Sequence, residues 1–254
     1  MTGGAVPQDR GAQRTSGISG MPAPSAHIRA VAFDLDGTLV DSAPDLAASA
    51  NAMLEALGHA RLPEGRVAAL IGNGVDRLVE GVLAASTGRA AEAKPLAAAA
   101  ALFRRCYAER LFDRSRVYAG VVEGLEALAA MGVARCCITN KASAFTLPLL
   151  DAAGLSGRLA FALCADRQEE RKPAPDMLLA ACLRLGVAPG ELLYVGDSRV
   201  DIGAARAAGC PVAVVDYGYH QGFPLATLDP DWIIGSLADL PMLTSMPSIA
   251  NPQT

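Results

Sequence analysis

Two acidic residues with one residue between them follow an apolar run near the start of the chain. The run, residues 28–33, is typical of a buried strand, and Asp34 and Asp36 come directly after it. Side chains two residues apart on a strand point to the same side, so we expect the two carboxylates to lie close together. Neighbouring carboxylates repel, and one pKa rises unless a cation or a shared proton compensates. The pair therefore predicts a site for a hard divalent cation or a division of roles between an ionised and a protonated carboxyl group.

The segments that would position these carboxylates alternate between strand and helix patterns. From residue 117 onward, short apolar runs alternate with segments whose apolar residues recur at helical spacing. Such alternation is typical of parallel strands joined by crossover helices, so we expect an α/β fold built on a doubly wound parallel sheet. The predicted strands are 28–33, 134–139, 161–164, 192–195 and 212–215, and the predicted helices are 122–131, 142–153, 175–185 and 201–208.

The segment between the first strand and this alternating region has a helical pattern throughout. It is rich in alanine and contains no strand signal, so we expect an all-helical cap domain, residues 43–116, inserted into a core domain of residues 27–42 and 117–244. Residues 1–26 are rich in Gly, Ser and Pro and predict a disordered N-terminal arm, and residues 245–254 predict a tail. Met21 is an alternative start to Met1, and the sequence does not decide between them.

Composition and charge exclude several classes of partner. The net charge of -4 and the pI near 5.4 provide no basic surface for nucleic acid or for an anionic membrane. No apolar run approaches the roughly 18 residues that a membrane span needs. The six cysteines form no CxxC pair, which favours buried thiols over metal ligands or disulfides. We expect a cytoplasmic protein that binds neither nucleic acid nor membrane.

Polar residues follow the other predicted strands at the points where those strands end. The carboxyl ends of parallel strands meet at one edge of a sheet, where ligands bind. Taken singly, each residue has a structural explanation, such as a helix cap, a solvated lysine or a turn; together they predict one site. These residues are Thr139, Asn140, Asp166, Lys172, Asp197 and Asp201.

The polar residues at this edge resemble those of the haloacid dehalogenase-like superfamily, in the branch of aspartate-nucleophile phosphatases with a helical cap inserted after the first strand. The resemblance covers about residues 28–240 and is carried by DLDGTLVDS (34–42), TNK (139–141), RKPAP (171–175) and VGDSRVD (195–201). Within this branch, SAPDL (42–46), IGNG (71–74) and YGY (217–219) are most similar to the phosphoglycolate phosphatases.

The resemblance implies Mg²⁺-dependent hydrolysis of a small phosphate monoester through an aspartyl-phosphate intermediate. Asp34 is implied as the nucleophile, and Asp36 as the general acid and base. An acid at position 36 favours phosphoester chemistry over dehalogenation. Thr139 and Lys172 would hold the phosphoryl group, and Lys172 would also pair with Asp34. The implied Mg²⁺ ligands are Asp34, the carbonyl of Asp36, Asp197 and Asp201, the last of these directly or through water.

The cap is expected to select the substrate. Gly72 and Gly74 expose backbone amides that, with Asn73 and a nearby Arg77, could bind the carboxylate of 2-phosphoglycolate, and Asn140 is implied as a further substrate contact. Other small phosphometabolites, such as a sugar phosphate or pyrophosphate, remain alternatives, as do a β-phosphoglucomutase-like mutase and a non-catalytic phosphometabolite-binding protein. Either a monomer or a homodimer is compatible with the sequence.

Two positions depart from the family pattern. Residues 164–165 are Cys and Ala where a glycine pair is common, so the loop before Asp166 is expected to differ in shape. Ala174 replaces a histidine of the lysine motif and removes a polar neighbour of Lys172.

Overall fold

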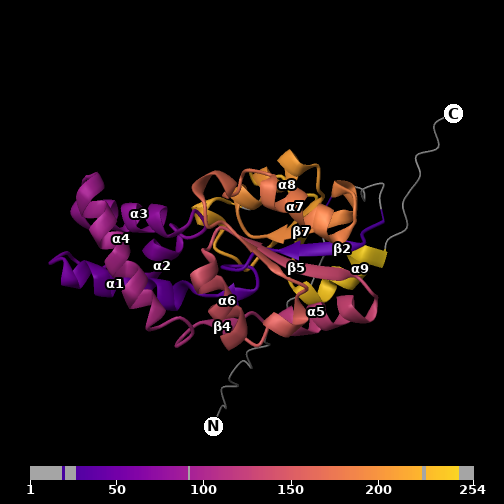
Figure 1. Ribbon diagram of the computed structural model, residues 1–254, viewed down its shortest axis with the longest axis horizontal. Coiled ribbons are helices and arrows are strands. Elements are labelled where there is room, and N and C mark those ends of the chain that lie inside the picture. The colour runs from indigo at the N-terminus through magenta and orange to yellow at the C-terminus, as the bar shows by residue number, and fades with distance from the viewer. Residues whose placement is uncertain (1–18, 21–26, 91, 225–226, 246–254) are drawn as a thin grey trace, which may run out of the picture.

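The computed structural model describes residues 19–20, 27–90, 92–224 and 227–245. Its centre is a seven-stranded sheet in the order β1-β9-β8-β7-β2-β5-β6, in which every pair is parallel except β1 with β9 (Figure 1). The strands are β1 (Ser19–Gly20), β2 (Ala30–Phe33), β5 (Ala134–Thr139), β6 (Ala162–Cys164), β7 (Leu192–Gly196), β8 (Val212–Val215) and β9 (Trp232–Ile234). The strand order reverses beside β2, so a crevice is expected at the carboxyl ends of β2, β5 and β7. The predicted α/β fold is confirmed.

Alternate residues of each strand enter one of two apolar layers, one on each face of the sheet. In β2, Val31 and Phe33 pack with α5, α6 and α9, whereas Ala30 and Ala32 pack with α7 and α8. Figure 1 shows α7 and α8 on the upper face and α5 and α9 on the lower face. These helices are α5 (Val121–Ala130), α6 (Ser143–Ala152), α7 (Asp176–Leu185), α8 (Arg199–Ala208) and α9 (Leu240–Ser245). Because both faces are covered, the central strands are continuous apolar runs, which is why the sequence pattern located them.

The cap is a separate helical layer with its own apolar cluster, on the left in Figure 1. Its helices are α1 (Ala43–Ala56), α2 (Glu64–Ala68), α3 (Val75–Thr87) and α4 (Ala93–Ala108), all within the expected segment 43–116. The chain enters and leaves the cap through an antiparallel pair, β3 (Val40–Asp41) and β4 (Arg116–Val117). Asp45 in the first turn of α1 accepts hydrogen bonds from the amides of Arg114 and Ser115 and from the Ser115 hydroxyl. This buried carboxylate joins the two ends of the insertion.

Several elements differ from the sequence expectation. β3, β4, β9 and α9 were not predicted, because runs of two to six residues are too short to show a period. The expectation that all of residues 1–26 are disordered is wrong at β1, where Ser19 and Gly20 pair with Ile233 and Trp232. Residues 1–18 and 21–26, which include Met1 and Met21, lie outside the described residues, as do residues 246–254. Short 3₁₀ helices complete the fold at Ser156–Arg158, Gln168–Glu170, Pro189–Glu191, His220–Gly222 and Leu237–Asp239.

Two further expectations can be compared with the structure. All six cysteines are free thiols, and Cys136, Cys137, Cys182 and Cys210 are buried, as expected for small apolar side chains. In the described part of the chain, no helix is both long enough and apolar enough to cross a bilayer.

Candidate active site

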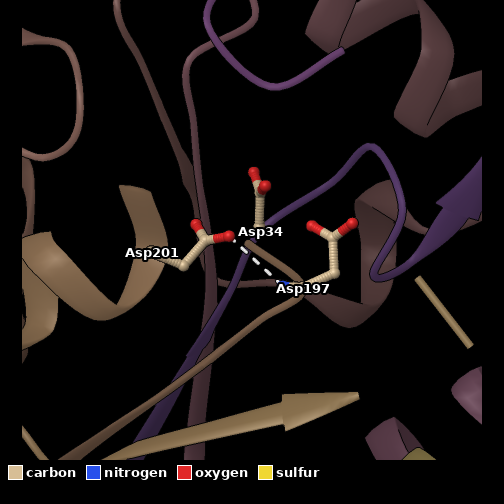
Figure 2. A group of neighbouring side chains, drawn as sticks. All are labelled: Asp34, Asp197 and Asp201. Carbon is tan, nitrogen blue, oxygen red and sulfur yellow. Dashed lines mark hydrogen bonds between the residues drawn. The ribbon is translucent and has the colours of Figure 1, made fainter. Parts of the chain in front are cut away.

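Three carboxylates converge at the carboxyl edge of the sheet. Asp34 follows β2, Asp197 follows β7, and Asp201 lies in the first turn of α8. Each offers an oxygen within 4.8 Å of the other two, and all three residues are buried. Figure 2 shows these side chains grouped above the strand ends, with a dashed line from Asp201 to the backbone of Asp197. The convergence expected from the sequence is therefore present for these residues.

Asp201 uses both of its oxygens within the protein. Oδ2 accepts hydrogen bonds from the amides of Asp197 (3.2 Å) and Ser198 (3.0 Å) and from the Ser198 hydroxyl (2.5 Å). Oδ1 lies 2.6 Å from Lys172 Nζ and accepts from the Tyr194 hydroxyl at 3.1 Å. These contacts fill the acceptor positions of the carboxylate. Asp201 is therefore placed to orient Lys172 and the Asp197 loop, and a contact with a metal through water fits better than a direct one.

Lys172 connects Asp201 to Asp34. Its side chain is fully buried, and Nζ lies 2.9 Å from Asp34 Oδ1. Burial disfavours the ammonium, but the charges of Asp201 and Asp34 outweigh burial and raise the Lys172 pKa above its usual value. Lys172 is therefore a permanent cation beside Asp34, as the sequence predicted.

Burial and neighbouring charges oppose the ionisation of two of the three carboxyl groups. Burial raises the pKa of Asp34 from 3.8 to about 6, against the lowering effect of Lys172 and with a further rise from Asp201. The pKa of Asp197 lies well above its usual value because of burial and the neighbouring charges of Asp201 and Asp34. A cluster in which burial and like charge oppose ionisation fits a bound cation.

The donor set also fits a hard divalent metal. Asp34 Oδ1 is buried and accepts no well-directed hydrogen bond, although Lys172 Nζ lies close to it. The Asp197 carboxylate is held through Oδ2, which accepts from the Tyr219 amide at 2.7 Å. Gly37, at φ +88°, lies directly against the Asp197 carboxylate, where a Cβ atom would collide. The glycine of the predicted motif is therefore required by the approach of the 34–37 turn to Asp197.

Asp36 lies beside this cluster and has different partners. Lys141 Nζ donates to Asp36 Oδ1 and Oδ2, both at 2.9 Å, and the Ser42 hydroxyl donates to Oδ1 at 2.5 Å. The Asp36 side chain is 12% exposed and the Lys141 side chain 4%. Asp36 therefore accepts hydrogen bonds from two side chains at the edge of the site.

Thr139 and Asn140 end β5 and occupy different positions in the network. Thr139 is buried, and its Oγ1 accepts from the Lys141 amide at 3.2 Å. The Asn140 amide group binds the backbone of Lys172 on both sides, with Oδ1 2.7 Å from the Lys172 nitrogen and Nδ2 3.1 Å from the Lys172 oxygen. Nδ2 also donates to the Gly72 carbonyl in the cap at 2.9 Å. Asn140 therefore positions the Lys172 loop against the cap, and its contact with substrate stays a prediction.

Two cavities flank the cap loop 72–74. A cavity of about 30 Å³ is lined by Asp34 and Asp36, and its other lining residues are Leu46, Ile71, Gly72, Gly74, Val75, Leu78, Asn140 and Lys141. A wider cavity of about 460 Å³ on the other side of the loop is lined by Asn73, Arg77, Gln168, Arg171, Lys172 and Pro173. Gly72 and Gly74 therefore border the cavity of the two catalytic candidates, whereas Asn73 and Arg77 border the other.

Comparison with known proteins identifies the family. The family model of the haloacid dehalogenase-like hydrolases matches residues 28–209. The chain belongs to this family. It is 46% identical over 218 residues to a phosphoglycolate phosphatase of Thiobacillus denitrificans, covering 86% of this chain and 96% of the relative. A phosphoglycolate phosphatase of Escherichia coli K12 is 39% identical over 243 residues, covering 89% of this chain and 96% of the relative.

Solved structures of haloacid dehalogenase-like proteins share the architecture. The crystal structure of a predicted phosphoglycolate phosphatase from Haemophilus somnus superposes with a TM-score of 0.82 at 35% identity, covering 87% of this chain and 99% of that one. CbbY from Rhodobacter sphaeroides, solved in complex with phosphate, has a TM-score of 0.69 at 21% identity and supports the fold alone.

Some residues of this hydrolase site were not assigned roles from the sequence. Lys141 lies within the predicted TNK motif, but its pairing with Asp36 spans 105 positions and has no local signal. Tyr194 lies inside the apolar run of β7, where its hydroxyl donor is indistinguishable from core packing. Tyr219 was noted only as part of YGY, yet its amide holds Asp197. Asp166 is exposed, and its Oδ1 accepts from the Ser143 amide at the start of α6, so it caps that helix.

Proposed function

We propose that this protein is a phosphatase that hydrolyses 2-phosphoglycolate to glycolate and phosphate through an aspartyl-phosphate at Asp34. The proposal depends chiefly on one observation: Asp34 is buried at the reversal point of the sheet, 2.9 Å from the ammonium of Lys172 and beside the Asp197 carboxylate. Phosphate monoesters hydrolyse extremely slowly without a catalyst, and a carboxylate nucleophile divides the reaction into two easier steps. The names of the relatives from Thiobacillus and Escherichia support the substrate.

The first step forms a bond between an Asp34 carboxylate oxygen and phosphorus. The bond from phosphorus to the ester oxygen breaks, its electron pair goes to the leaving alkoxide, and protonated Asp36 supplies the proton that converts the alkoxide to the alcohol. Lys172 is close enough to neutralise charge on both Asp34 and the phosphoryl oxygens. Thr139, buried at the end of β5, would donate its hydroxyl to a phosphoryl oxygen.

The second step releases phosphate. Asp36, now a carboxylate, takes a proton from a water molecule while the water oxygen forms a bond to phosphorus. The bond between phosphorus and Asp34 breaks, and its electron pair returns to the carboxylate. Lys141 Nζ and the Ser42 hydroxyl donate hydrogen bonds to the Asp36 carboxyl group and would orient it for this proton transfer.

Mg²⁺ is the proposed cofactor. Asp34, the Asp36 carbonyl and Asp197 would hold it, with Asp201 acting through a water molecule, since the Asp201 oxygens are already engaged. A bound Mg²⁺ would neutralise the repulsion between the carboxylate nucleophile and the phosphate dianion.

Two residues of the cap lie beside the proposed catalytic carboxyl groups. Gly72 and Gly74 line the same cavity as Asp34 and Asp36. Their backbone amides are the proposed contacts for the carboxylate of the substrate. The names of the relatives favour 2-phosphoglycolate over the sugar-phosphate and mutase alternatives.

The remaining expectations stay proposals. A cytoplasmic location is consistent with six free thiols, which persist in a reducing compartment. The small phosphorylated metabolite is the only partner that we propose, with the protein acting as a monomer or homodimer.

A substrate panel tests the proposal. Hydrolysis of 2-phosphoglycolate, the glycerol phosphates, pyrophosphate and an aryl phosphate is measured with Mg²⁺ and again with a chelator. We expect a preference of more than about tenfold in kcat/KM for 2-phosphoglycolate and complete loss of activity with the chelator. A smaller preference would contradict the substrate but not the phosphatase.

Asp34→Asn tests the covalent route. The variant is expected to retain the fold and less than about one hundredth of the wild-type rate, because an amide cannot attack phosphorus. A folded, pure variant that keeps a higher rate would contradict nucleophilic catalysis by Asp34.

A further inference from the structure

Lys141 is a buried cation that the two steps above do not use directly. It follows Thr139 and Asn140 at the end of β5, and its side chain is 4% exposed. Its Nζ lies 2.9 Å from both oxygens of Asp36 and 4.7 Å from the ring centroid of Tyr107, which belongs to α4 of the cap. An ammonium has three N–H donors, of which the Asp36 carboxylate can take two, and the neutral Tyr107 hydroxyl lies near the same ammonium. The contacts therefore place a cation against Asp36 whose other neighbour from the cap carries no charge.

Lys141 also borders the cavity of the two proposed catalytic carboxyl groups. Lys141 lines the cavity together with Asp34 and Asp36, and it is the one cationic residue among the described residues that do so. The cap side of the cavity is apolar apart from glycine backbone, with Leu46 and Val75 among its residues. A second negative group on a substrate would be desolvated in this space and would need a fixed cation within reach.

Arg77, the arginine that the sequence placed near the substrate carboxylate, has another environment. Its side chain is 61% exposed and pairs with Glu80 at 2.7 Å. It lines the wider cavity, separated from Asp34 and Asp36 by the cap loop 72–74. A cation so exposed would contribute little to binding in the cavity that Asp34 and Asp36 line.

We propose that Lys141 binds the anionic end of the leaving group and thereby sets the preference of the enzyme for phosphate esters with a short carboxylate arm. This inference rests on the proposed function, because it assumes that the ester oxygen receives its proton from Asp36. That oxygen must lie within hydrogen-bond distance, about 3 Å, of the Asp36 carboxyl group. Lys141 Nζ is at 2.9 Å from the same carboxyl group. A carboxylate attached through one methylene group to that oxygen therefore lies within reach of Lys141.

Two substrates of nearly equal size measure this contact. 2-Phosphoglycolate carries the carboxylate, and ethyl phosphate has the same two-carbon chain without it. The specificity ratio is defined as kcat/KM for 2-phosphoglycolate divided by kcat/KM for ethyl phosphate. Loss of one desolvated, charge-assisted contact lowers such a ratio by about 10- to 100-fold.

Lys141→Met is the test variant, because methionine keeps an unbranched stem beside Tyr107 and removes the charge. We expect the ratio to fall by at least about tenfold, with ethyl phosphate hydrolysis reduced by less than 2-phosphoglycolate hydrolysis. Lys141→Arg retains the cation in a larger planar group and is expected to lower the ratio by less than Lys141→Met does. Circular dichroism verifies the fold, and Lys141→Gln replaces the methionine variant if that variant is unfolded.

Three results would overturn the inference. If both substrates lose the same factor in the methionine or glutamine variant, Lys141 acts only by positioning Asp36. If Arg77→Gln lowers the specificity ratio to near one and the Lys141 variants do not, the carboxylate is bound on the other side of the cap loop. A wild-type ratio near one would overturn both this inference and the proposed substrate, whereas the first two results leave the phosphoglycolate phosphatase activity intact.

Discussion

Replacing Asp201 with asparagine should destabilise the folded protein, although the change exchanges only one non-hydrogen atom of the side chain. The two Asp201 oxygens face donors on both sides, with Lys172 Nζ and the Tyr194 hydroxyl at Oδ1 and the Asp197 and Ser198 donors at Oδ2. An asparagine amide turned either way points its NH₂ group at donors, and Lys172 loses one of its two carboxylate partners and keeps only Asp34. Breaking a buried ion pair by removing one partner costs about 3 to 5 kcal/mol. We expect Asp201→Asn to lower the free energy of unfolding by that amount.

The same substitution at Asp34 should have the opposite sign in metal-free protein. Burial raises the Asp34 pKa from 3.8 to about 6, so the ionised carboxylate destabilises the fold at pH 7.5. One pKa unit corresponds to about 1.4 kcal/mol, so removing this charge should raise the free energy of unfolding by about 1 to 3 kcal/mol. Lys172 remains paired with Asp201 in this variant. Asp201→Asn is therefore expected to lower the free energy of unfolding, whereas Asp34→Asn is expected to raise it.

Urea unfolding of the chelator-treated proteins at pH 7.5, followed by circular dichroism, measures both effects. A pH series adds a check on the sign. Between about pH 4 and pH 6 the folded protein binds more protons at Asp34 than the unfolded chain does, so the wild type loses stability relative to Asp34→Asn as pH rises. Below about pH 4, Asp34 is protonated in both the folded and the unfolded state and no longer makes the free energy of unfolding depend on pH. A loss under about 1 kcal/mol for Asp201→Asn, or equal losses for both variants, would refute the reasoning.

Two further variants probe the loop after β8 and the turn after β2. Tyr219→Phe removes the acceptor of two backbone amides at the start of α1 and should lower the free energy of unfolding by about 2 to 4 kcal/mol. Tyr217→Phe, the control, loses one hydrogen bond to a carbonyl and should lower it by about 1 kcal/mol. Equal shifts of the two urea midpoints would contradict this. Gly37→Ala should raise the Mg²⁺ concentration needed for half-maximal activity by at least about tenfold, because its Cβ would displace the Asp197 carboxylate. Gly58→Ala, also at positive φ but with no atom within 4 Å, is the matched control and should leave that concentration unchanged.

The sequence predicted the central fold because its signals are local. Strands buried on both faces are continuous apolar runs, and β5 and β8 have the predicted bounds. The convergence of Asp34, Asp197 and Asp201 followed from a topological rule about the carboxyl ends of parallel strands, which needs no knowledge of side-chain packing.

The contacts that the sequence did not predict join segments far apart in the chain. Lys141 pairs with Asp36 across 105 positions, and the Tyr219 hydroxyl binds the Ser42 amide across 177. Both depend on how the cap and the loop after β8 dock on the core. Residue type and spacing contain no information about such docking, since a lysine after a strand is equally compatible with solvent.

The position of the hinge explains how movement of the cap can reach the chemistry. The cap departs through β3, only a few residues beyond Asp36, and Ser42 at its entrance donates to the Asp36 carboxylate. Tyr219 contacts the same entrance through its hydroxyl, which donates to Asp41 at 2.9 Å, while its amide holds Asp197. A rotation of α1 that displaced Ser42 would therefore alter the proposed general acid and base and, through Tyr219, a predicted metal ligand at the same time. If the cap closes over substrate, we expect its closure to be coupled to assembly of the site, because the same short segment bonds to both.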